Sequence, residues 1–223
     1  MSEPATPDVR RRPIRARDTR WAHATAVALR QAGWQPNQIS CLSTVFAGVG
    51  AAALVGSSLV ASVPGRVELL LLAAVGIQLR LLCNLFDGLV AVEGGLRTKT
   101  GEIYNELPDR ISDILLLAAA GYACRGVGWE RELGWAAAAL AVAVAYVRAF
   151  GGQLGVAQQF VGPMAKQQRM AALTVACVTT AGETLLGSPL RTMVWALGLI
   201  VLGSILTAAR RTIRIARELE SRP

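Results

Sequence analysis

The residues best suited to chemistry are gathered between Asn84 and Asp113, inside a chain that is otherwise strongly apolar. Asn84 and Asp87 are three residues apart in one apolar run, and Asn105, Asp109 and Asp113 are four apart in the next. In a helix, these spacings place each set on one face. Carboxylate and amide oxygens that converge from two helices are the ligands that a hard divalent cation such as Mg²⁺ needs. The spacing therefore predicts a metal site.

Basic residues accompany these acids and could bind phosphate. The candidates lie near the acids or in later segments that face the same side: Arg80, Arg110, Arg148, Lys166 and Arg169. Guanidinium and ammonium groups form strong charge-assisted hydrogen bonds with phosphate. Two alternatives remain open, because a buried arginine can simply neutralise a carboxylate, and a basic loop can follow from membrane orientation alone.

The elements that must position these groups are apolar segments of membrane-spanning length. The chain has 223 residues, of which 53% are hydrophobic, and its mean hydropathy is +0.42. About 20 apolar residues are needed to cross a bilayer as a helix. Six segments come near that length, at residues 39–63, 67–92, 104–124, 133–154, 170–186 and 190–208. We therefore expect an all-α polytopic membrane protein with six transmembrane helices.

The remaining segments have different compositions. Residues 1–18 are polar, basic and proline-containing, which predicts a disordered cytoplasmic arm. Residues 19–35 place tryptophan and small apolar residues at helical spacing between arginines, as in an amphipathic interfacial helix. The expected organisation is thus the arm, this helix, a membrane domain at 36–215 and a cytoplasmic tail at 216–223.

The net charge of +8 is distributed as expected for a membrane protein. The N-terminal arm, Arg97, Lys99 and the C-terminal arginines fall on one side of the predicted topology. Only four basic residues fall on the other side: Arg66, Arg125, Arg131 and Arg191. This asymmetry predicts that both termini and the acidic cluster face the cytoplasm, in a bacterial inner membrane. Anionic lipid headgroups explain the charge better than nucleic acid, because aromatic residues are not interleaved with it.

The acidic stretch also resembles the signature of the CDP-alcohol phosphotransferases, Asp-x2-Asp-Gly-x2-Ala-Arg-x8-Gly-x3-Asp-x3-Asp. Five residues stand in register with this pattern: Asp87, Gly88, Ala91, Gly101 and Asp109. They are spread over a fixed frame and include acids and glycines, so the match is more specific than a lone glycine motif.

Three positions depart from the signature. Asn84 and Asn105 stand where the pattern has aspartate, and Val92 stands where it has arginine. An amide oxygen can bind a metal ion, but it contributes no charge. Asp113 or Glu106 could supply a missing carboxylate, and the alternative for Asp113 is a carboxylate that pairs with an arginine.

The resemblance implies six spanning helices, a homodimer and two divalent ions, Mg²⁺ or Mn²⁺. It also implies transfer of a phosphatidyl group from a CDP-lipid such as CDP-diacylglycerol to the hydroxyl of a polar alcohol, with release of CMP. By register, Asp109 would be the general base. The metal ligands would be drawn from Asn84, Asp87, Asn105, Asp109 and Asp113. The nucleotide would approach Asn84, Gly88, Ala91 and Gly101, where small residues permit close contact.

Two other functions are compatible with the same residues. A catalytically silent relative that acts in a membrane complex would account for the two asparagines. A small ion-binding transporter would also use intramembrane acids. The transporter is disfavoured because the acids share one depth in the predicted topology and mark no route across the membrane.

Overall fold

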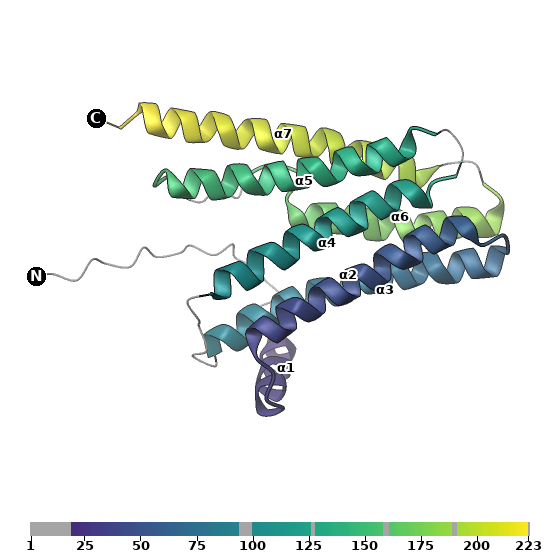
Figure 1. The fold of residues 1–223 in the computed structure, drawn as a ribbon, viewed down its shortest axis with the longest axis horizontal. Helices are drawn as coiled ribbons and strands as arrows, with labels where there is room; N and C mark the ends of the chain where they lie inside the picture. The colour runs from purple at the N-terminus through teal and green to yellow at the C-terminus, as the bar shows by residue number, and fades with distance from the viewer. Residues whose placement is uncertain (1–18, 94–99, 126–127, 158–160, 189–190, 223) are drawn as a thin grey trace, which may run out of the picture.

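The computed structural model describes residues 19–93, 100–125, 128–157, 161–188 and 191–222, and within these ranges it contains seven helices and no strand. The helices are α1 (Arg20–Gln31), α2 (Pro36–Leu59), α3 (Val63–Glu93), α4 (Gly101–Ala123), α5 (Glu130–Gln153), α6 (Lys166–Leu186) and α7 (Thr192–Glu220). Helices α2 to α7 run side by side as an elongated bundle, and α1 lies across one side of it (Figure 1). The prediction of an all-α protein is confirmed.

The predicted segments correspond to α2–α7, with shifted ends. The largest difference is at α7, which continues to Glu220 instead of ending at 208, and the other helix ends differ by no more than four residues. Much of the segment expected as a tail, 216–223, is therefore helical. The amphipathic segment 19–35 contains α1, and the predicted arm at 1–18 lies outside the described residues.

Four helices in the described part of the chain are long and apolar enough to cross a membrane. They are Pro36–Leu59, Val63–Val92, Glu130–Gln153 and Thr192–Glu220, and the mean hydropathy of their apolar parts is 1.7 to 2.0. Helices α4 and α6 differ because charged residues occupy their first turns, where α4 carries Glu102 and Glu106 and α6 carries Lys166 and Arg169. An integral membrane protein is indicated, and the six-span topology stays a prediction.

Local signals fix where several helices begin and end. Pro36 occupies the first turn of α2, where a missing N–H costs nothing, and the backbone N–H of Gln35 donates to Gln38 Oε1 at 3.0 Å. Helix α6 ends at Leu186 and is followed by Gly187, whose φ of 62° is in the left-handed region that favours glycine. The backbone N–H of Thr192 donates to Glu183 at 3.0 Å, so that α6 caps the start of α7.

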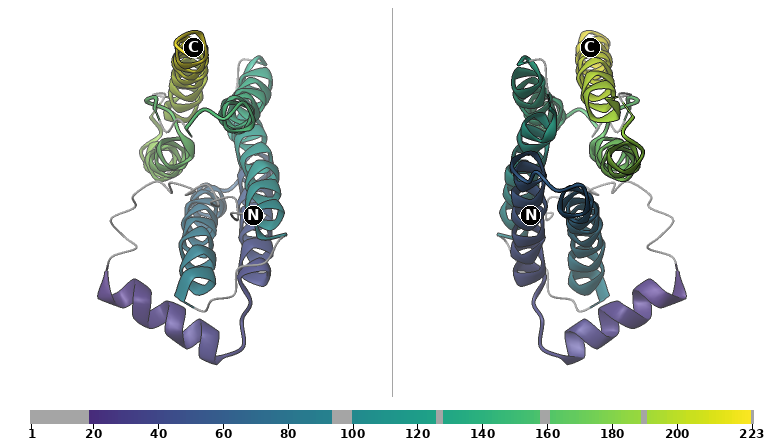
Figure 2. Two further views of the ribbon diagram at one scale, coloured as in Figure 1. Left: turned by 90° about the vertical axis from the view of Figure 1, so that its left-hand side faces the viewer. Right: turned by 90° about the vertical axis from the view of Figure 1, so that its right-hand side faces the viewer.

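Small residues let the helices approach closely. Helix α2 packs on both α3 and α4, while α5 packs on α4 and α7. At the α2–α3 crossing, a Cβ on Gly76 would lie 2.9 Å from the carbonyl oxygen of Phe46. The core consists mainly of alanine and leucine. In the end-on views, α7 lies on the opposite side of the bundle from α1 (Figure 2).

Candidate active site: an acid and base cluster between α3, α4 and α6

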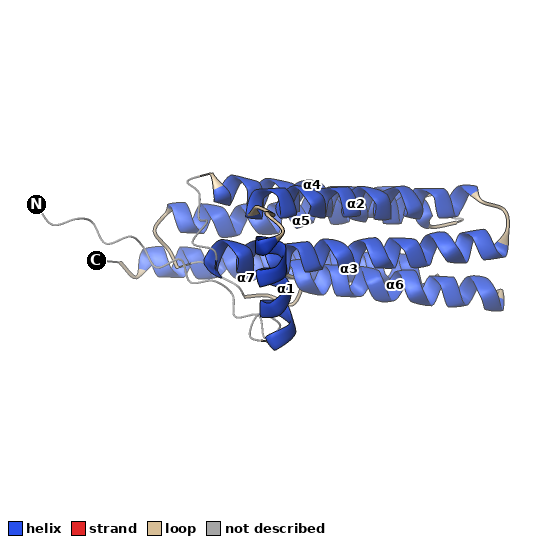
Figure 3. Cartoon of the chain, turned by 90° about the horizontal axis from the view of Figure 1, so that it is seen from below, coloured by secondary structure: helices blue, strands red, loops and turns tan. Residues whose placement is uncertain are grey.

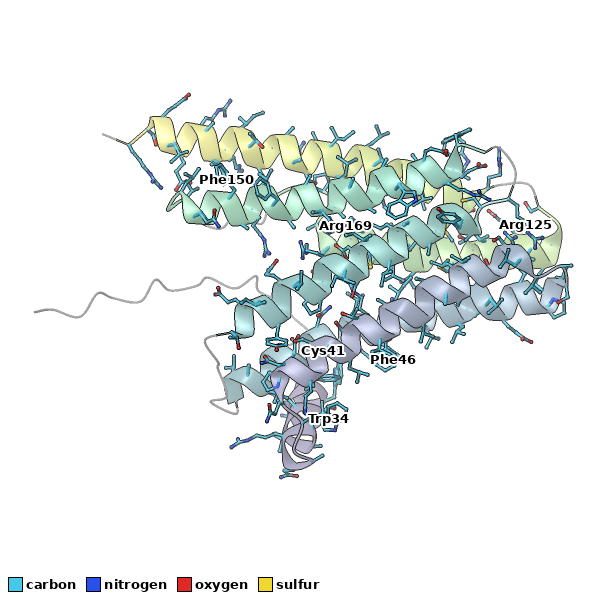
Figure 4. The ribbon with its side chains drawn as sticks, in the orientation of Figure 1. Trp34, Cys41, Phe46, Arg125, Phe150 and Arg169 are labelled. Atoms are coloured by element: carbon cyan, nitrogen blue, oxygen red, sulfur yellow. The ribbon has the colours of Figure 1, made fainter. Side chains whose placement is uncertain are left out.

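The predicted acidic residues come together where three helices meet. Helix α3 carries Asp87, α4 carries Asp109 and Asp113, and α6 carries Lys166 and Arg169 in its first turn. Helix α6 begins part-way along the bundle, so its first turn lies beside the middle of α4 (Figures 1 and 3). Figure 4 shows Arg169 within the bundle, far from Arg125 at the other end.

Asp87 is buried and is held by α2, a helix outside the acidic stretch of the sequence. Its Oδ2 accepts a hydrogen bond of 2.6 Å from the hydroxyl of Ser40 on α2. Asp87 also lies close enough to Lys166 and Asp109 to interact with both electrostatically. Because Ser40 occupies the first turns of α2, the Pro36-x3-Ser40 opening of that helix carried the signal that could have identified it.

Asp109 is buried and faces three cations. Its Oδ2 forms an ion pair with Lys166 and lies 3.7 Å from Arg110 Nη2, and its Oδ1 lies 3.5 Å from Arg80 Nη2. Within the described part of the chain, Oδ1 is buried and has no hydrogen-bond partner. A carboxylate in this state has one oxygen engaged and one still able to accept a proton or a ligand.

Asp113 is completely buried between two buried arginines. Its Oδ1 lies 2.7 Å from Arg80 Nη2, and its Oδ2 lies 2.6 Å from Arg169 Nη2. Arg169 also donates through Nη1 to the backbone oxygen of Met164 at 3.0 Å. The sequence left two roles open for Asp113, a metal ligand and a carboxylate that pairs with an arginine. The observed geometry is that of a carboxylate paired with arginines. These pairs tie α3, α4 and α6 together.

A more exposed group of charges lies beside this cluster. Glu106 pairs with Arg148 on α5 and lies 3.7 Å from Arg110 Nη2, while 45% of its side chain is exposed. Arg148, expected as a phosphate-binding candidate, thus has a carboxylate partner. Asn105 is exposed. Asn84 is partly buried, and its Nδ2 has no partner among the described residues.

The small residues expected near a nucleotide lie at two helix ends. Gly88 and Ala91 are in the last turns of α3, and Gly101 is the first residue of α4; all three are partly buried. Arg97 and Lys99, in the connection between these helices, lie outside the described residues. The structure therefore places these positions on the side of the acid cluster where α3 ends and α4 begins.

The donor chemistry of the site fits a divalent cation, with few charges to hold it. Asp87, Asp109 and Asn84 offer only oxygen ligands through their carboxylates and amide oxygen, as hard cations require, and Asp109 Oδ1 is a buried oxygen without a hydrogen-bond partner in the described ranges. Yet no group of three or more His, Cys, Asp or Glu residues is arranged to hold an ion within those ranges. Both oxygens of Asp113 are occupied by arginines.

Comparisons with known proteins were made by sequence and by structure. No protein-family model matches the chain. No curated protein has a significant match to it either. Several solved structures resemble it in fold. Among them are three structures of phosphatidylinositol phosphate synthase (PgsA1) from Mycobacterium tuberculosis.

The three PgsA1 structures match most of the chain. The one with CDP-DAG bound has a TM-score of 0.68 at 18% identity, covering 88% of this chain and 94% of that one. The complex with manganese and citrate has a TM-score of 0.69 at 18% identity, covering 87% and 88%. The apo form has a TM-score of 0.61 at 19% identity, covering 85% and 93%. The chain thus has the fold of PgsA1, a CDP-alcohol phosphotransferase, as its acidic stretch suggested.

Proposed function

We propose that this protein is a CDP-alcohol phosphotransferase of phospholipid biosynthesis. It transfers a phosphatidyl group from a CDP-linked lipid such as CDP-diacylglycerol to the hydroxyl of a polar alcohol and releases CMP. The proposal unites two lines of support, the fold shared with PgsA1 and the register of the acidic stretch with the family signature. One of the similar structures has CDP-DAG bound, and another contains manganese.

The observation that carries the proposal is the meeting of Asp87 and Asp109. They stand at signature positions that are separated along the chain and lie on different helices, yet both are buried in one cluster with Lys166 and Arg80. Charged groups are costly to bury in a membrane domain, so they are retained mainly where they have a function. Acids beside cations are suited to a reaction that moves a proton and a phosphate.

The reaction assigns Asp109 the role of general base. Its Oδ1 accepts the proton of the acceptor hydroxyl, and the resulting oxygen attacks the phosphorus on the lipid side of the pyrophosphate. A new oxygen–phosphorus bond forms, and CMP leaves with the electron pair of the broken bond. A divalent ion held by Asp87, Asp109 and Asn84, with Asn105 one helical turn before Asp109, would neutralise pyrophosphate charge and improve the leaving group.

The cations around the acids have graded roles. Arg80 and Arg169 are buried and keep Asp113 in place, whereas Lys166 retains 23% exposure of its side chain and can reach a phosphate. Arg110 and Arg148 lie beside the more exposed Glu106 and would meet a polar acceptor from that side. Fold similarity does not name the acceptor alcohol, because it is selected by such local contacts.

The cellular setting follows from the same proposal. Mg²⁺ or Mn²⁺ would be the physiological ion, and the enzyme would act as a homodimer among membrane lipids. The positive-inside distribution supports a cytoplasmic location of the acid cluster and both termini, in a bacterial inner membrane.

The proposal is tested by measuring CMP release from CDP-diacylglycerol. Purified protein in lipid nanodiscs is incubated with Mg²⁺ or Mn²⁺ and a panel of polar alcohols, including inositol phosphate, glycerol phosphate and serine. We expect CMP release that depends on one acceptor class and stops when the divalent ion is chelated. The matched control is Asp109→Asn, which keeps the shape of the side chain and removes the base.

Three outcomes would count against the proposal. Turnover that survives exhaustive chelation would show that the reaction does not require a divalent ion. Full activity in Asp109→Asn would show that Asp109 is not the general base. Absence of CMP release with every acceptor, in protein that still binds CDP-diacylglycerol, would instead favour the catalytically silent relative, for which the neutral Asn84 and Asn105 are the supporting observation.

A further inference from the structure

The cluster between α3, α4 and α6 is electrically balanced by its own residues. Its carboxylates are Asp87, Asp109 and Asp113, and its cations are Arg80, Lys166 and Arg169. Each cation is in an ion pair with one of these acids, and most of the six side chains are almost completely buried. The balance is reached with side chains alone, before any divalent ion or nucleotide binds.

The neighbouring charges add to the positive side. Glu106 is shared by Arg110 and Arg148, so this adjoining group has one acid and two cations. Taken together, four carboxylates face five cations among the described residues of the cluster and this adjoining group. Asn84 and Asn105, which stand at aspartate positions of the signature, add no negative charge.

This balance works against a free divalent cation. To bind Asp109 fully, the ion must displace or oppose Lys166, which already pairs with Oδ2 of that carboxylate. Coulomb interactions are strong where water is excluded. Repulsion between the divalent ion and the cations Arg80 and Lys166 therefore offsets the attraction of the ion to the acids. Oxygen ligands are present, and the missing component is negative charge.

The nucleotide supplies that charge. A pyrophosphate brings at least two negative charges and several oxygen ligands, and Mg²⁺ is commonly bound through one or two carboxylates together with substrate phosphates. Lys166 is placed to respond, because it is the first residue of α6, its long side chain is partly exposed, and its ammonium can move from Asp109 to a phosphate.

We propose that in this chain the divalent cation and the pyrophosphate bind interdependently, so that the ion is held tightly only when the nucleotide is present. Lys166 pairs with Asp109 before the nucleotide binds and turns to a phosphate when the ion and nucleotide arrive. Asn84 and Asn105 cause this dependence by removing two charges. The inference rests on the proposed function, since it takes the CDP group as the ligand.

Equilibrium dialysis of Mn²⁺ tests the inference without measuring catalysis. Full-length protein in detergent micelles is dialysed against Mn²⁺ alone and against Mn²⁺ with CDP, and the excess metal and CDP on the protein side are measured. Free Mn²⁺–CDP complex distributes equally across the dialysis membrane and cancels. We expect CDP to tighten Mn²⁺ binding by at least about tenfold, the equivalent of ~1.4 kcal/mol.

Two variants should weaken the dependence on CDP. Lys166→Met removes a cation, and the double variant Asn84→Asp with Asn105→Asp adds two anions. Each should bind Mn²⁺ in the absence of CDP at least about tenfold more tightly than the wild-type chain does. Arg125→Met is the matched control, because it also removes a cation but lies at the other end of the bundle (Figure 4). Its Mn²⁺ binding should match the wild type.

The outcomes separate this inference from the proposed function. Equally tight Mn²⁺ binding with and without CDP, in protein that retains CDP, would overturn the inference and leave the proposed function standing. Unchanged Mn²⁺ binding in both the Lys166→Met and the double variant would also overturn it. If no form of the protein retains either Mn²⁺ or CDP, the proposed function fails, and the inference fails with it.

Discussion

One helical turn separates Asp109 from Asp113, yet their partners give the two carboxylates different properties. Asp113 has a guanidinium on each oxygen, at 2.7 Å and 2.6 Å, so both of its oxygens are already engaged. Asp109 pairs mainly through Oδ2, and its Oδ1 keeps its accepting capacity within the described part of the chain. We therefore interpret Asp113 as a positioning residue and Asp109 as the reactive one.

Replacing Asp87 by asparagine should lower CMP release by at least about a hundredfold, because the proposed metal site loses one of its two available carboxylates. The hydrogen bond from Ser40 can be retained by the amide oxygen, so the fold should persist. Turnover and thermal unfolding are measured on the same preparation. The matched control is Glu68→Gln, which removes an acid from the same helix, far from the cluster. Retained turnover in Asp87→Asn would remove the metal assignment.

Replacing Asp113 by asparagine should destabilise the protein without changing its metal requirement. Removing one partner of a buried ion pair typically costs about 3–5 kcal/mol, because the buried charge that remains is uncompensated. Arg169 would be left in that state, and Arg80 would keep only its longer carboxylate contact of 3.5 Å with Asp109 Oδ1. We expect a lower unfolding temperature in detergent.

The comparison for Asp113 is Arg148→Gln, whose ion pair is partly exposed and should contribute no more than about 1 kcal/mol. Its unfolding temperature should therefore change much less. A rightward shift of the Mn²⁺ dependence of turnover in Asp113→Asn, at unchanged unfolding temperature, would show that Asp113 is a metal ligand after all.

At the scale of helices, the position of α6 decides what the acids of α4 meet. The helix begins at Lys166 part-way along the bundle, and its first turn supplies both Lys166 and Arg169 to the cluster. Helix α2 contributes from the other side, where Ser40 holds Asp87 and the hydroxyl of Thr44 lies 3.5 Å from the backbone oxygen of Pro108. The cluster is thus built by four helices, two of which lie outside the acidic stretch.

A close approach between α4 and α5 should be sensitive to added volume. A Cβ on Gly121 in α4 would lie 2.6 Å from the backbone oxygen of Glu130 in α5, a distance that requires the helices to separate. Gly121→Ala should destabilise the protein by about 1–3 kcal/mol through overpacking. The measurement is thermal or denaturant unfolding in detergent.

Gly182→Ala is the control for this prediction, since no atom lies within 4 Å of a Cβ at that helical position. It should be neutral or stabilising by up to about 1 kcal/mol, because alanine favours helix over glycine. Equal effects of the two substitutions would show that the α4–α5 crossing is not as close as described.

For the whole molecule, the two ends of the bundle have different chemistry. The acid and base cluster lies toward the end where α3 stops and α4 starts, whereas Arg191 and Glu130 pair at 2.8 Å near the opposite end. At that opposite end Arg66 is buried and donates through Nη2 to the backbone oxygen of Ala123 at 3.4 Å. Basic residues at that end thus contribute to the contacts between helices.

The topology predicts that the two ends face opposite sides of the membrane. In a cysteine-free background, Glu132→Cys should react with an impermeant maleimide added from outside right-side-out vesicles, and Ser221→Cys should react only after the vesicles are opened. Both residues are exposed. Labelling of position 132 only from the cytoplasmic side would refute the six-span model, and so would labelling of both positions from the same side.

The sequence alone determined the helical class, the approximate position of the helices, and the stretch that is proposed to carry the chemistry. These features depend on local patterns: apolar runs of membrane length, and acids at helical spacing in a fixed frame. Helix ends were less accurate, as at α7, because an amphipathic helix can continue past its apolar part. Asp87, Gly88, Ala91, Gly101 and Asp109 could be selected by register alone.

Only the tertiary structure decided which charge meets which. The spacing of Asp113 fits a metal ligand and an ion-pair partner equally well, and the choice depended on Arg80 and Arg169, which come from two other helices. Likewise, nothing in the local pattern joins Lys166 to Asp109 or Ser40 to Asp87. Such pairs are set by how helices distant in sequence pack together, and in a low-dielectric interior they determine which carboxylate remains available for chemistry.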